Sequence, residues 1–183
     1  RQPRDGERVT VTTTSVSAGD SPDVRNTVTW TEHGSRTIEA ELNLRHTFEG
    51  MGRTSEETSH QRDVSSGVAD GSNQHGAVTG DHAGHVVAHR FMLDQGLHNL
   101  FPQNGNFNTS AYKTMENEWA ALVADGLQVE GTVAFDFSAD NRRPDVVKVE
   151  FEGLDDGGAV VFEPTEDPYF INESGQPYDR TYR

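Results

Sequence analysis

The chain has 183 residues, which suits one domain with a core of its own and is short for two. A hydrophobic content of 32% and a mean hydropathy of −0.73 predict a small core beneath a strongly polar surface. The apolar runs are far shorter than the roughly 20 residues that cross a bilayer, so we expect no membrane partner. The absence of cysteine excludes disulfide bonds and thiolate metal sites.

The net charge of −15 is unevenly distributed along the chain. Residues 114–183 hold 16 acidic and 5 basic residues and so account for −11 of this charge. Residues 63–113, in contrast, hold 4 acidic and 2 basic residues together with five of the eight histidines. Because a nucleic-acid-binding surface is usually basic, the total charge argues against such a function, whereas the nearly neutral central region leaves it open.

Alternating polar and apolar residues predict strands in the N-terminal part of the chain. Residues 1–35 contain two such segments, RVTVTTTSV and NTVTW, separated by a break that contains Gly, Asp and Pro. Residues 36–48 form the clearest half-buried strand. Its apolar face consists of Ile38, Ala40, Leu42 and Leu44. Residues 50–80 are rich in Gly, Ser and Asp, and we expect a polar surface excursion that brings the chain to a functional site.

One helix and three further strands are expected in the C-terminal part. The helix runs from Thr109 or Ser110 to Ala124, because apolar residues recur there every three or four positions. The strands are expected within 127–137, 145–153 and 157–163. The turn-rich tail that follows is expected to lie on the surface, or to pack by Tyr169 and Phe170 alone.

This order of elements indicates an α+β fold with a mostly antiparallel sheet. We expect a single domain over residues 1–183. Its functional core is expected at 81–120, between the polar excursion of residues 50–80 and an acidic, β-rich part at 127–183.

The segment from Asp81 to Glu116 concentrates residues that carry chemistry. Its histidines at 82, 85 and 89 do not predict a zinc site, because residues 82 and 85 point to opposite faces of a strand. A single histidine, His85, could instead act as the general base that activates water. The alternative is a structural histidine whose ring is satisfied by its neighbours.

Side-chain amides are abundant just before the predicted helix. They belong to Asn99, Gln103, Asn104, Asn106 and Asn108. An amide oxygen is an acceptable ligand for Mg²⁺, although an Asn at this place is also an ordinary helix cap. Glu116 lies eight residues after Asn108, two turns along the helix and about 80° around it. It could reach a metal ion through water, or it could be a solvated carboxylate.

Together these residues resemble the DNA/RNA non-specific endonucleases of the ββα-metal (His-Me finger) superfamily. The resemblance covers residues 81–120, through HAGHVVA and NLFPQNGNFNTSAYKTMENEW. The matching positions are Gly84-His85, Asn99, Pro102-Gln103, Phe107-Asn108, Tyr112 and Glu116.

The resemblance implies a role for each of these polar residues. His85 would be the general base, and Asn108 would bind Mg²⁺ or Mn²⁺ directly. Glu116 would order water on the metal ion. Asn99 and Gln103 would be accessory residues that contact the substrate.

The chain departs from the family at one position. Many relatives carry Asp-Arg before Gly-His, whereas this chain has His82 and Ala83, so the arginine that would hold the scissile phosphate is absent there. Arg90, Arg62 and Arg53 could replace it. We favour Arg90 because it lies on the same segment as His85.

We therefore expect a metal-dependent endonuclease that hydrolyses DNA and RNA with little sequence preference. Such an enzyme would be exported, either as a scavenging nuclease or as the toxin domain of a larger protein with an immunity protein as its partner. Two alternatives remain. The finger could have weakened or lost its activity and serve as a binding module, or the site could hydrolyse another phosphoester.

Overall fold

The computed structural model describes residues 7–14, 25–34, 36–48, 52–67 and 75–182. Within these ranges one antiparallel sheet supports a separate two-stranded finger and its helices, which confirms the expected α+β class. No helix in the described ranges is long and apolar enough to cross a membrane.

The large sheet has the strand order β1-β2-β3-β6-β7-β8, with β9 also paired to β7. All of its pairs are antiparallel. Its strands are β1 (Glu7–Thr14), β2 (Arg25–His33), β3 (Arg36–Leu44), β6 (Gln128–Asp136), β7 (Val146–Leu154), β8 (Val160–Phe162) and β9 (Tyr169–Ile171).

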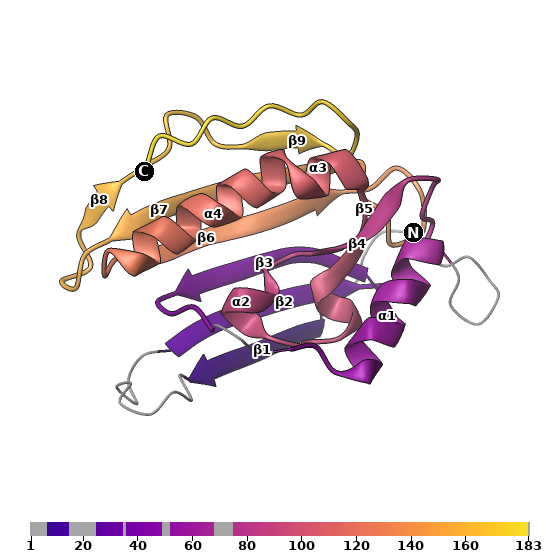
Figure 1. Cartoon of the computed structure of the whole chain (residues 1–183), viewed down its shortest axis with the longest axis horizontal. Helices are drawn as coiled ribbons and strands as arrows, with labels where there is room; N and C mark the ends of the chain where they lie inside the picture. The colour runs from indigo at the N-terminus through magenta and orange to yellow at the C-terminus, as the bar shows by residue number, and fades with distance from the viewer. Residues whose placement is uncertain (1–6, 15–24, 35, 49–51, 68–74, 183) are drawn as a thin grey trace.

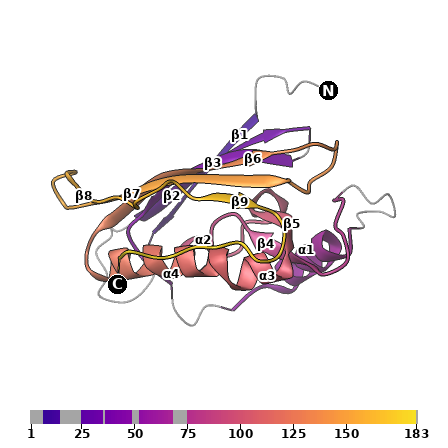
Figure 2. The same ribbon diagram turned by 90° about the horizontal axis from the view of Figure 1, so that it is seen from above.

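The segment between β3 and β6 forms the finger and its surroundings. Its elements are α1 (Ser55–Ser66), β4 (Asp81–His85), α2 (His89–Met92), a 3-10 turn (Leu97–Asn99), β5 (Leu100–Asn104), α3 (Gly105–Thr109) and α4 (Ala111–Ala124). In Figure 1, α4 runs along β6 and β7, while the finger and α2 lie beside β1 to β3. Figure 2 shows that the helices and the finger cover one face of the sheet.

The core lies between that face and the helices. Aromatic side chains fill much of it, and Trp30, Tyr112 and Trp119 are fully buried. Their burial explains why a chain with few apolar residues still folds, because each ring removes a large area from water.

The buried face of β3 differs in one place from the alternation expected from the sequence. The pairing of β2 with β3 shifts register between Thr31 and Glu32, and this bulge leaves Ile38 without a partner. As a result Thr37 is buried and Ile38 is half-buried, whereas Ala40 and Leu42 face the core as expected.

The expected polar excursion contains a helix, α1, that apolar periodicity did not indicate. Thr54 caps it by accepting a hydrogen bond from the Glu57 N–H at 3.1 Å, and Gly67 ends it in the left-handed conformation. The pattern Thr-x-x-Glu followed by a glycine was a local signal for this helix. Only Glu57 and Val64 of α1 are buried, so its apolar face is too small for a periodicity test.

The amide-rich connector and the tail are also more ordered than expected. Residues 100–104 form β5, which pairs with β4. In the tail, Phe170 is buried but Tyr169 is 61% exposed, so the expected packing through both rings is wrong. Other tail residues take part instead: Asn172 is buried, and Tyr178 and Tyr182 pack against the core.

Candidate active site

The finger places His85 and Asn108 on two neighbouring elements. His85 is the last residue of β4, and Asn108 lies on α3, which follows β5 directly. The long helix α4 begins at Ala111, so Asn108 lies on a separate short turn and not at the start of the long helix. Ser110, with φ −115° and ψ −91°, separates the two helices.

Two glycines allow this close arrangement of strands and turn. A Cβ on Gly84 would lie 1.9 Å from Gln103 Oε1, so the glycine before His85 makes room for the side chain on β5. A Cβ on Gly105 would lie 2.7 Å from His82 Nε2 and 2.8 Å from the Gly80 carbonyl oxygen. Both positions therefore exclude any residue with a side chain unless the neighbours move.

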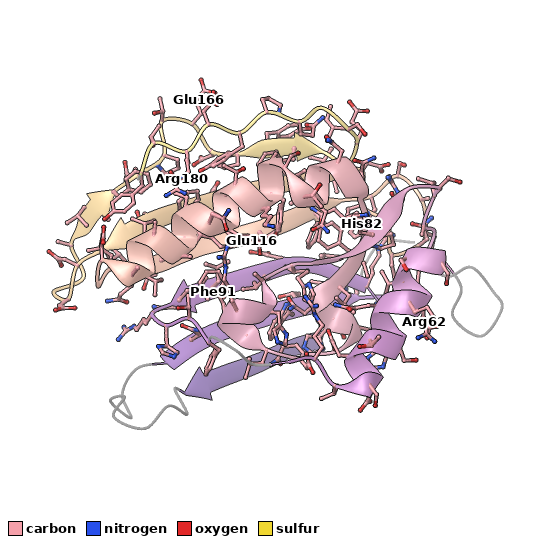
Figure 3. All side chains as sticks on the ribbon, in the orientation of Figure 1. Arg62, His82, Phe91, Glu116, Glu166 and Arg180 are labelled. Atoms are coloured by element: carbon pink, nitrogen blue, oxygen red, sulfur yellow. The ribbon has the colours of Figure 1, made fainter. Side chains whose placement is uncertain are left out.

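An open pocket joins the finger to α1. Its lining residues are Arg53, Thr58, Gln61, Arg62, Ser65, Asp81, His82, Ala83, His85 and Asn108. The structure thus brings the expected base His85 and the expected ligand Asn108 to one cavity. It also places Arg53 and Arg62 there, and Figure 3 shows Arg62 on α1 and His82 on β4.

His82 lies directly beside Asn108. The Asn108 Nδ2 atom is 3.2 Å from His82 Nδ1, and His82 is exposed at the pocket. With its amide nitrogen turned to the imidazole, Asn108 has its amide oxygen available for another partner. His82 is thus a candidate functional residue, although the alternation of side chains along a strand argued against a shared zinc site with His85.

His85 is held from the side of α1. Its Nε2 atom is 3.8 Å from Glu57 Oε1 and 3.4 Å from Gln61 Nε2. Glu57 and Gln61 are four residues apart on one helix and therefore lie on the same face of it. The capping pattern predicts the helix, but no pattern in the sequence predicts that the helix packs against β4. Neither Glu57 nor Gln61 could therefore be identified as a neighbour of His85.

Glu116 lies behind the pocket and does not line it. The carboxylate accepts a hydrogen bond from the Ala88 N–H, and its Oε2 atom is buried without a partner among the described residues. Burial raises the pKa of Glu116 to about 8, although the positive charge of Arg90 and the Ala88 N–H act in the opposite direction. Figure 3 shows Glu116 on α4, on the side toward Phe91.

Arg90 is also outside the pocket lining. Its Nη2 atom donates to Asn117 Oδ1 at 2.7 Å, and its guanidinium lies 5.5 Å from the centre of the Phe91 ring. Among the three arginines considered as replacements for the missing one, Arg53 and Arg62 have the better position. The expectation that Arg90 replaces the arginine missing at Ala83 does not agree with this placement.

Asn99 and Gln103 are both completely buried and do not line the pocket. Asn99 Oδ1 accepts from the Val87 N–H at 3.0 Å and from Trp30 Nε1 at 3.2 Å, and its Nδ2 donates to the Val87 carbonyl at 2.8 Å. Asn99 thus fixes the chain just after His85. In this structure neither side chain offers an atom to a substrate in the pocket.

The acidic charge gathers on the other side of the sheet. A second hollow there is lined by Glu41, Glu130, Glu150, Glu152, Glu163 and Asp167, among others. Along β6, Val129 and Val133 face the core, so Glu130 and Thr132 point to the opposite face. Among the described residues, Asp81 is the only acidic one that lines the finger pocket, and Arg143 pairs with it at 2.7 Å. The net charge of −15 is therefore compatible with an anionic ligand at the finger.

Comparisons with known proteins bear on the family and the fold of the chain. Residues 21–153 match the profile of a family described as DNA/RNA non-specific endonuclease. Among solved structures, an extracellular endonuclease has a similar fold, with a TM-score of 0.53 and 15% identity over 93% of this chain and 91% of that chain. No curated protein sequence matches the chain significantly.

Proposed function

Since the chain belongs to the DNA/RNA non-specific endonuclease family, we propose that it cleaves DNA and RNA by metal-dependent hydrolysis of phosphodiester bonds. The observation that carries this proposal is the single pocket lined by His85, Asn108, Arg53 and Arg62. It joins a candidate base, an oxygen ligand and two cations within one cavity on a ββα finger.

In the proposed reaction His85 is the general base. It takes a proton from a water molecule, and the oxygen of that water attacks the phosphorus. The bond from phosphorus to the 3′ oxygen then breaks. Asn99 supports the step indirectly, because its three hydrogen bonds fix the backbone that follows His85.

The residues of the site fit a hard divalent cation such as Mg²⁺ or Mn²⁺. The Asn108 amide oxygen is available to bind it, while the buried Glu116 carboxylate has an unpartnered oxygen that could act through water. A bound cation would supply positive charge that stabilises the developing charge on the phosphate and the departing oxygen. No group of three His, Asp or Glu residues in the described ranges converges as a metal site, and Mg²⁺ commonly takes only one or two protein oxygens.

Arg53 and Arg62 would hold the substrate phosphates in place of the arginine missing at Ala83. Both side chains are exposed, and both line the pocket with His85. Each arginine that contacts a phosphate adds roughly one unit to the slope of affinity against salt concentration. We therefore expect Arg62→Ala to raise KM about tenfold and to lower the salt slope by about one. Arg45→Ala, an exposed arginine outside the pocket, is the matched control.

We also propose that the enzyme acts outside the cell, as does the extracellular endonuclease that shares its fold. A toxin role with an immunity protein stays a prediction. Testing it requires expression with and without secretion, and a cell that tolerates the active enzyme in its cytoplasm without a protector would contradict it.

The deciding experiment is degradation of plasmid DNA and of a structured RNA with added Mg²⁺ or Mn²⁺, with EDTA, and by His85→Ala. We expect cleavage with either ion, none with EDTA, and a loss of at least about 100-fold in His85→Ala. His33→Ala, at the end of β2 and outside the pocket, controls for removal of a histidine.

Two outcomes would contradict the proposal in different ways. Full activity of His85→Ala would refute the assigned base. If no form of the protein cleaved either nucleic acid, a binding module would be the better interpretation, and gel-shift assays with uncut DNA would then be decisive.

A further inference from the structure

We propose that Glu57 of α1 is a positioning residue for His85. Its carboxylate holds the Nε2 side of the imidazole and leaves Nδ1 to take the proton from the attacking water. This inference rests on the proposed nuclease function and adds a residue outside the ββα finger to its machinery.

The position of Glu57 is determined by contacts at both carboxylate oxygens. Oε2 accepts a hydrogen bond from the Gly96 N–H at 3.1 Å, while Oε1 lies 3.8 Å from His85 Nε2. The side chain is 2% exposed, and Oε1 has no hydrogen-bond partner among the described residues. A buried carboxylate oxygen left without a donor is costly, and the His85 N–H, 3.8 Å away, can provide one after a small ring movement.

The capping pattern makes the orientation of Glu57 unusual. In a Thr-x-x-Glu capping box, the glutamate returns to the backbone N–H of the cap residue. Here the Glu57 N–H does bond to Thr54, but the Thr54 N–H donates to Asp94 Oδ2 at 2.7 Å. Asp94 therefore replaces Glu57 at the cap, and the Glu57 side chain is left to face His85.

A carboxylate beside one imidazole nitrogen determines which nitrogen is basic. With its proton on Nε2 and directed at Glu57, neutral His85 presents the lone pair of Nδ1 as the base. When Nδ1 takes the proton, the Glu57 charge stabilises the imidazolium. Burial alone would raise the pKa of Glu57, but the facing His85 ring and the Gly96 N–H hold the pKa below its ordinary value, so the carboxylate stays ionised.

The other groups around His85 do not supply this charge. Gln61 is neutral, and with Nε2 protonated its amide would present oxygen to the ring. The His89 ring, 6.4 Å away, faces Asp94 at 3.1 Å. Of the pocket residues, Arg53, Arg62 and His82 bring no negative charge, and Asp81 is paired with Arg143. Glu57 is therefore the carboxylate that acts on this imidazole.

The test uses Glu57→Gln in the full chain and measures kcat, KM and the pH profile of DNA cleavage with Mg²⁺. We expect kcat to fall about 10- to 100-fold with KM nearly unchanged, because the base is misoriented while phosphate contacts remain. Glu57→Gln removes the negative charge that stabilises the protonated form of the base, so the acidic limb of the profile should move to lower pH by about one unit. Glu56→Gln, an exposed neighbour in the same helical turn, controls for charge loss at the helix start.

A second measurement is independent of turnover. Long-range ¹H–¹⁵N NMR spectra of the metal-free protein should show the His85 ring as the Nε2–H tautomer, and this preference should weaken in Glu57→Gln. Glu57→Asp keeps the charge but shortens the side chain, so it should retain the wild-type acidic limb better than Glu57→Gln does. If Glu57→Gln is poorly folded, Glu57→Asp tests the position of the carboxylate instead, and the Nε2–H preference should weaken because the charge lies farther from the ring.

The outcomes separate the two proposals. An active wild type with unchanged kcat, pH limb and tautomer in Glu57→Gln would overturn the role of Glu57 and leave the nuclease assignment intact. A wild type without nuclease activity would remove the proposed function, whereas the tautomer measurement would still report on the pairing of Glu57 with His85. A folded Glu57→Gln protein with a lower melting temperature but an unmoved tautomer would indicate a structural role only and would also overturn the proposal.

Discussion

Two buried glutamates on α4, two residues apart, have opposite surroundings. Glu118 is completely buried and accepts hydrogen bonds from the Tyr178 hydroxyl and, at 2.8 Å each, from the N–H groups of Thr181 and Tyr182. Glu116 accepts one from the Ala88 N–H, and its Oε2 atom has none within the described chain. The first carboxylate holds the C-terminal tail to the helix, whereas the second is left partly unsatisfied.

The same contrast extends to the two regions around these residues. Apart from His89 and Asp94, which face each other at 3.1 Å, the buried side-chain N and O atoms that the described residues leave without a hydrogen bond belong to residues between 57 and 119. This is the region of α1, the finger and α4 that surrounds His85. Buried polar groups without partners are rare in stable cores, and they are retained where an ion, water or a reaction requires them. Within the described chain, buried polar atoms without a partner are thus concentrated around the finger, whereas the tail satisfies the Glu118 carboxylate.

The largest expected effect concerns the pH dependence of stability at Glu116. Its pKa is raised to about 8 in the folded protein, so the folded state binds more protons than the unfolded state and stability falls as pH rises from about 4.5 to 8. In the metal-free protein, Glu116→Gln should remove this loss and be more stable by roughly 3 kcal/mol at pH 7. Urea unfolding of the wild type and of Glu116→Gln at pH 5, 7 and 8 measures this difference in the free energy of unfolding.

The difference between the two proteins at each pH isolates Glu116. Burial lowers the pKa of His75 and His98, and these residues act in the opposite sense because they favour folding as pH rises toward neutrality. A difference that stays constant from pH 5 to pH 8 would contradict the contrast between the two glutamates. With Mg²⁺ present, the same variant should lose activity about 10- to 100-fold, as expected for a residue that orients metal-bound water.

The next effect tests the other side of α4. Glu118→Ala leaves the Tyr178 hydroxyl and two N–H groups without their acceptor, and it should lower the free energy of unfolding by about 2–4 kcal/mol. Nuclease activity per folded molecule should stay within about twofold, because Glu118 lies outside the pocket. Glu166→Ala removes an exposed charge from the tail and should change stability by less than about 0.5 kcal/mol. If Glu118→Ala were as stable as the wild type, the contacts between Glu118 and the C-terminal tail would not stabilise the fold.

A smaller effect is expected where the finger is packed most closely. Gly84→Ala places a methyl group 1.9 Å from Gln103 Oε1, and it should cost about 2 kcal/mol by overpacking. Adding Gln103→Ala removes the clash with Oε1 but keeps the Gln103 Cβ 2.7 Å from the new methyl group, so it should restore only part of this loss, which a double-mutant cycle measures. Gly52→Ala, where nothing lies within 4 Å, is the control. Without any rescue by Gln103→Ala, another contact must explain the need for glycine.

The smallest effect concerns how the finger is anchored to the large sheet. Arg143 binds both Asp81 oxygens, through Nε at 2.7 Å and Nη2 at 3.1 Å, and Asp81 has a fully buried side chain. Arg143→Lys loses the two-pronged contact and should cost about 1 kcal/mol. Lys148→Ala breaks an exposed pair with Asp136 and should cost less than about 0.5 kcal/mol. If both variants lowered the melting temperature equally, burial would not strengthen the pair of Arg143 with Asp81.

Much of the fold could be predicted from local patterns. Alternation along residues 36–44 and 146–154 identified strands because one face of each is buried, and the apolar spacing of α4 identified a helix for the same reason. Apolar periodicity does not predict an element that lacks an apolar face. The helix α1 buries only Glu57 and Val64, so it has almost no apolar face. The residues of β5 include amides and a proline, which are more typical of a loop than of a strand.

The site was predictable to the extent that it is local in sequence. His85 and Asn108 were identified from a motif within 28 residues, and both line the pocket. Arg62 and Glu57 lie on α1, which precedes β4 by some 15 residues, and Arg53 lies just before this helix, so their contact with the finger depends on packing. The Thr-x-x-Glu pattern distinguishes Glu57 from the exposed Glu56 beside it, but it predicts that the Glu57 side chain returns to the helix cap and not that it faces His85.

The sequence alone determined the α+β class, the family, and His85 and Asn108 as candidate site residues, because each depends on side-chain type and spacing along the chain. The tertiary structure decided which arginines reach the pocket, which carboxylate faces His85, and why the two glutamates of α4 differ. These properties depend on which elements pack together, since burial and neighbouring donors determine whether a carboxylate is satisfied, charged or left available for a metal ion.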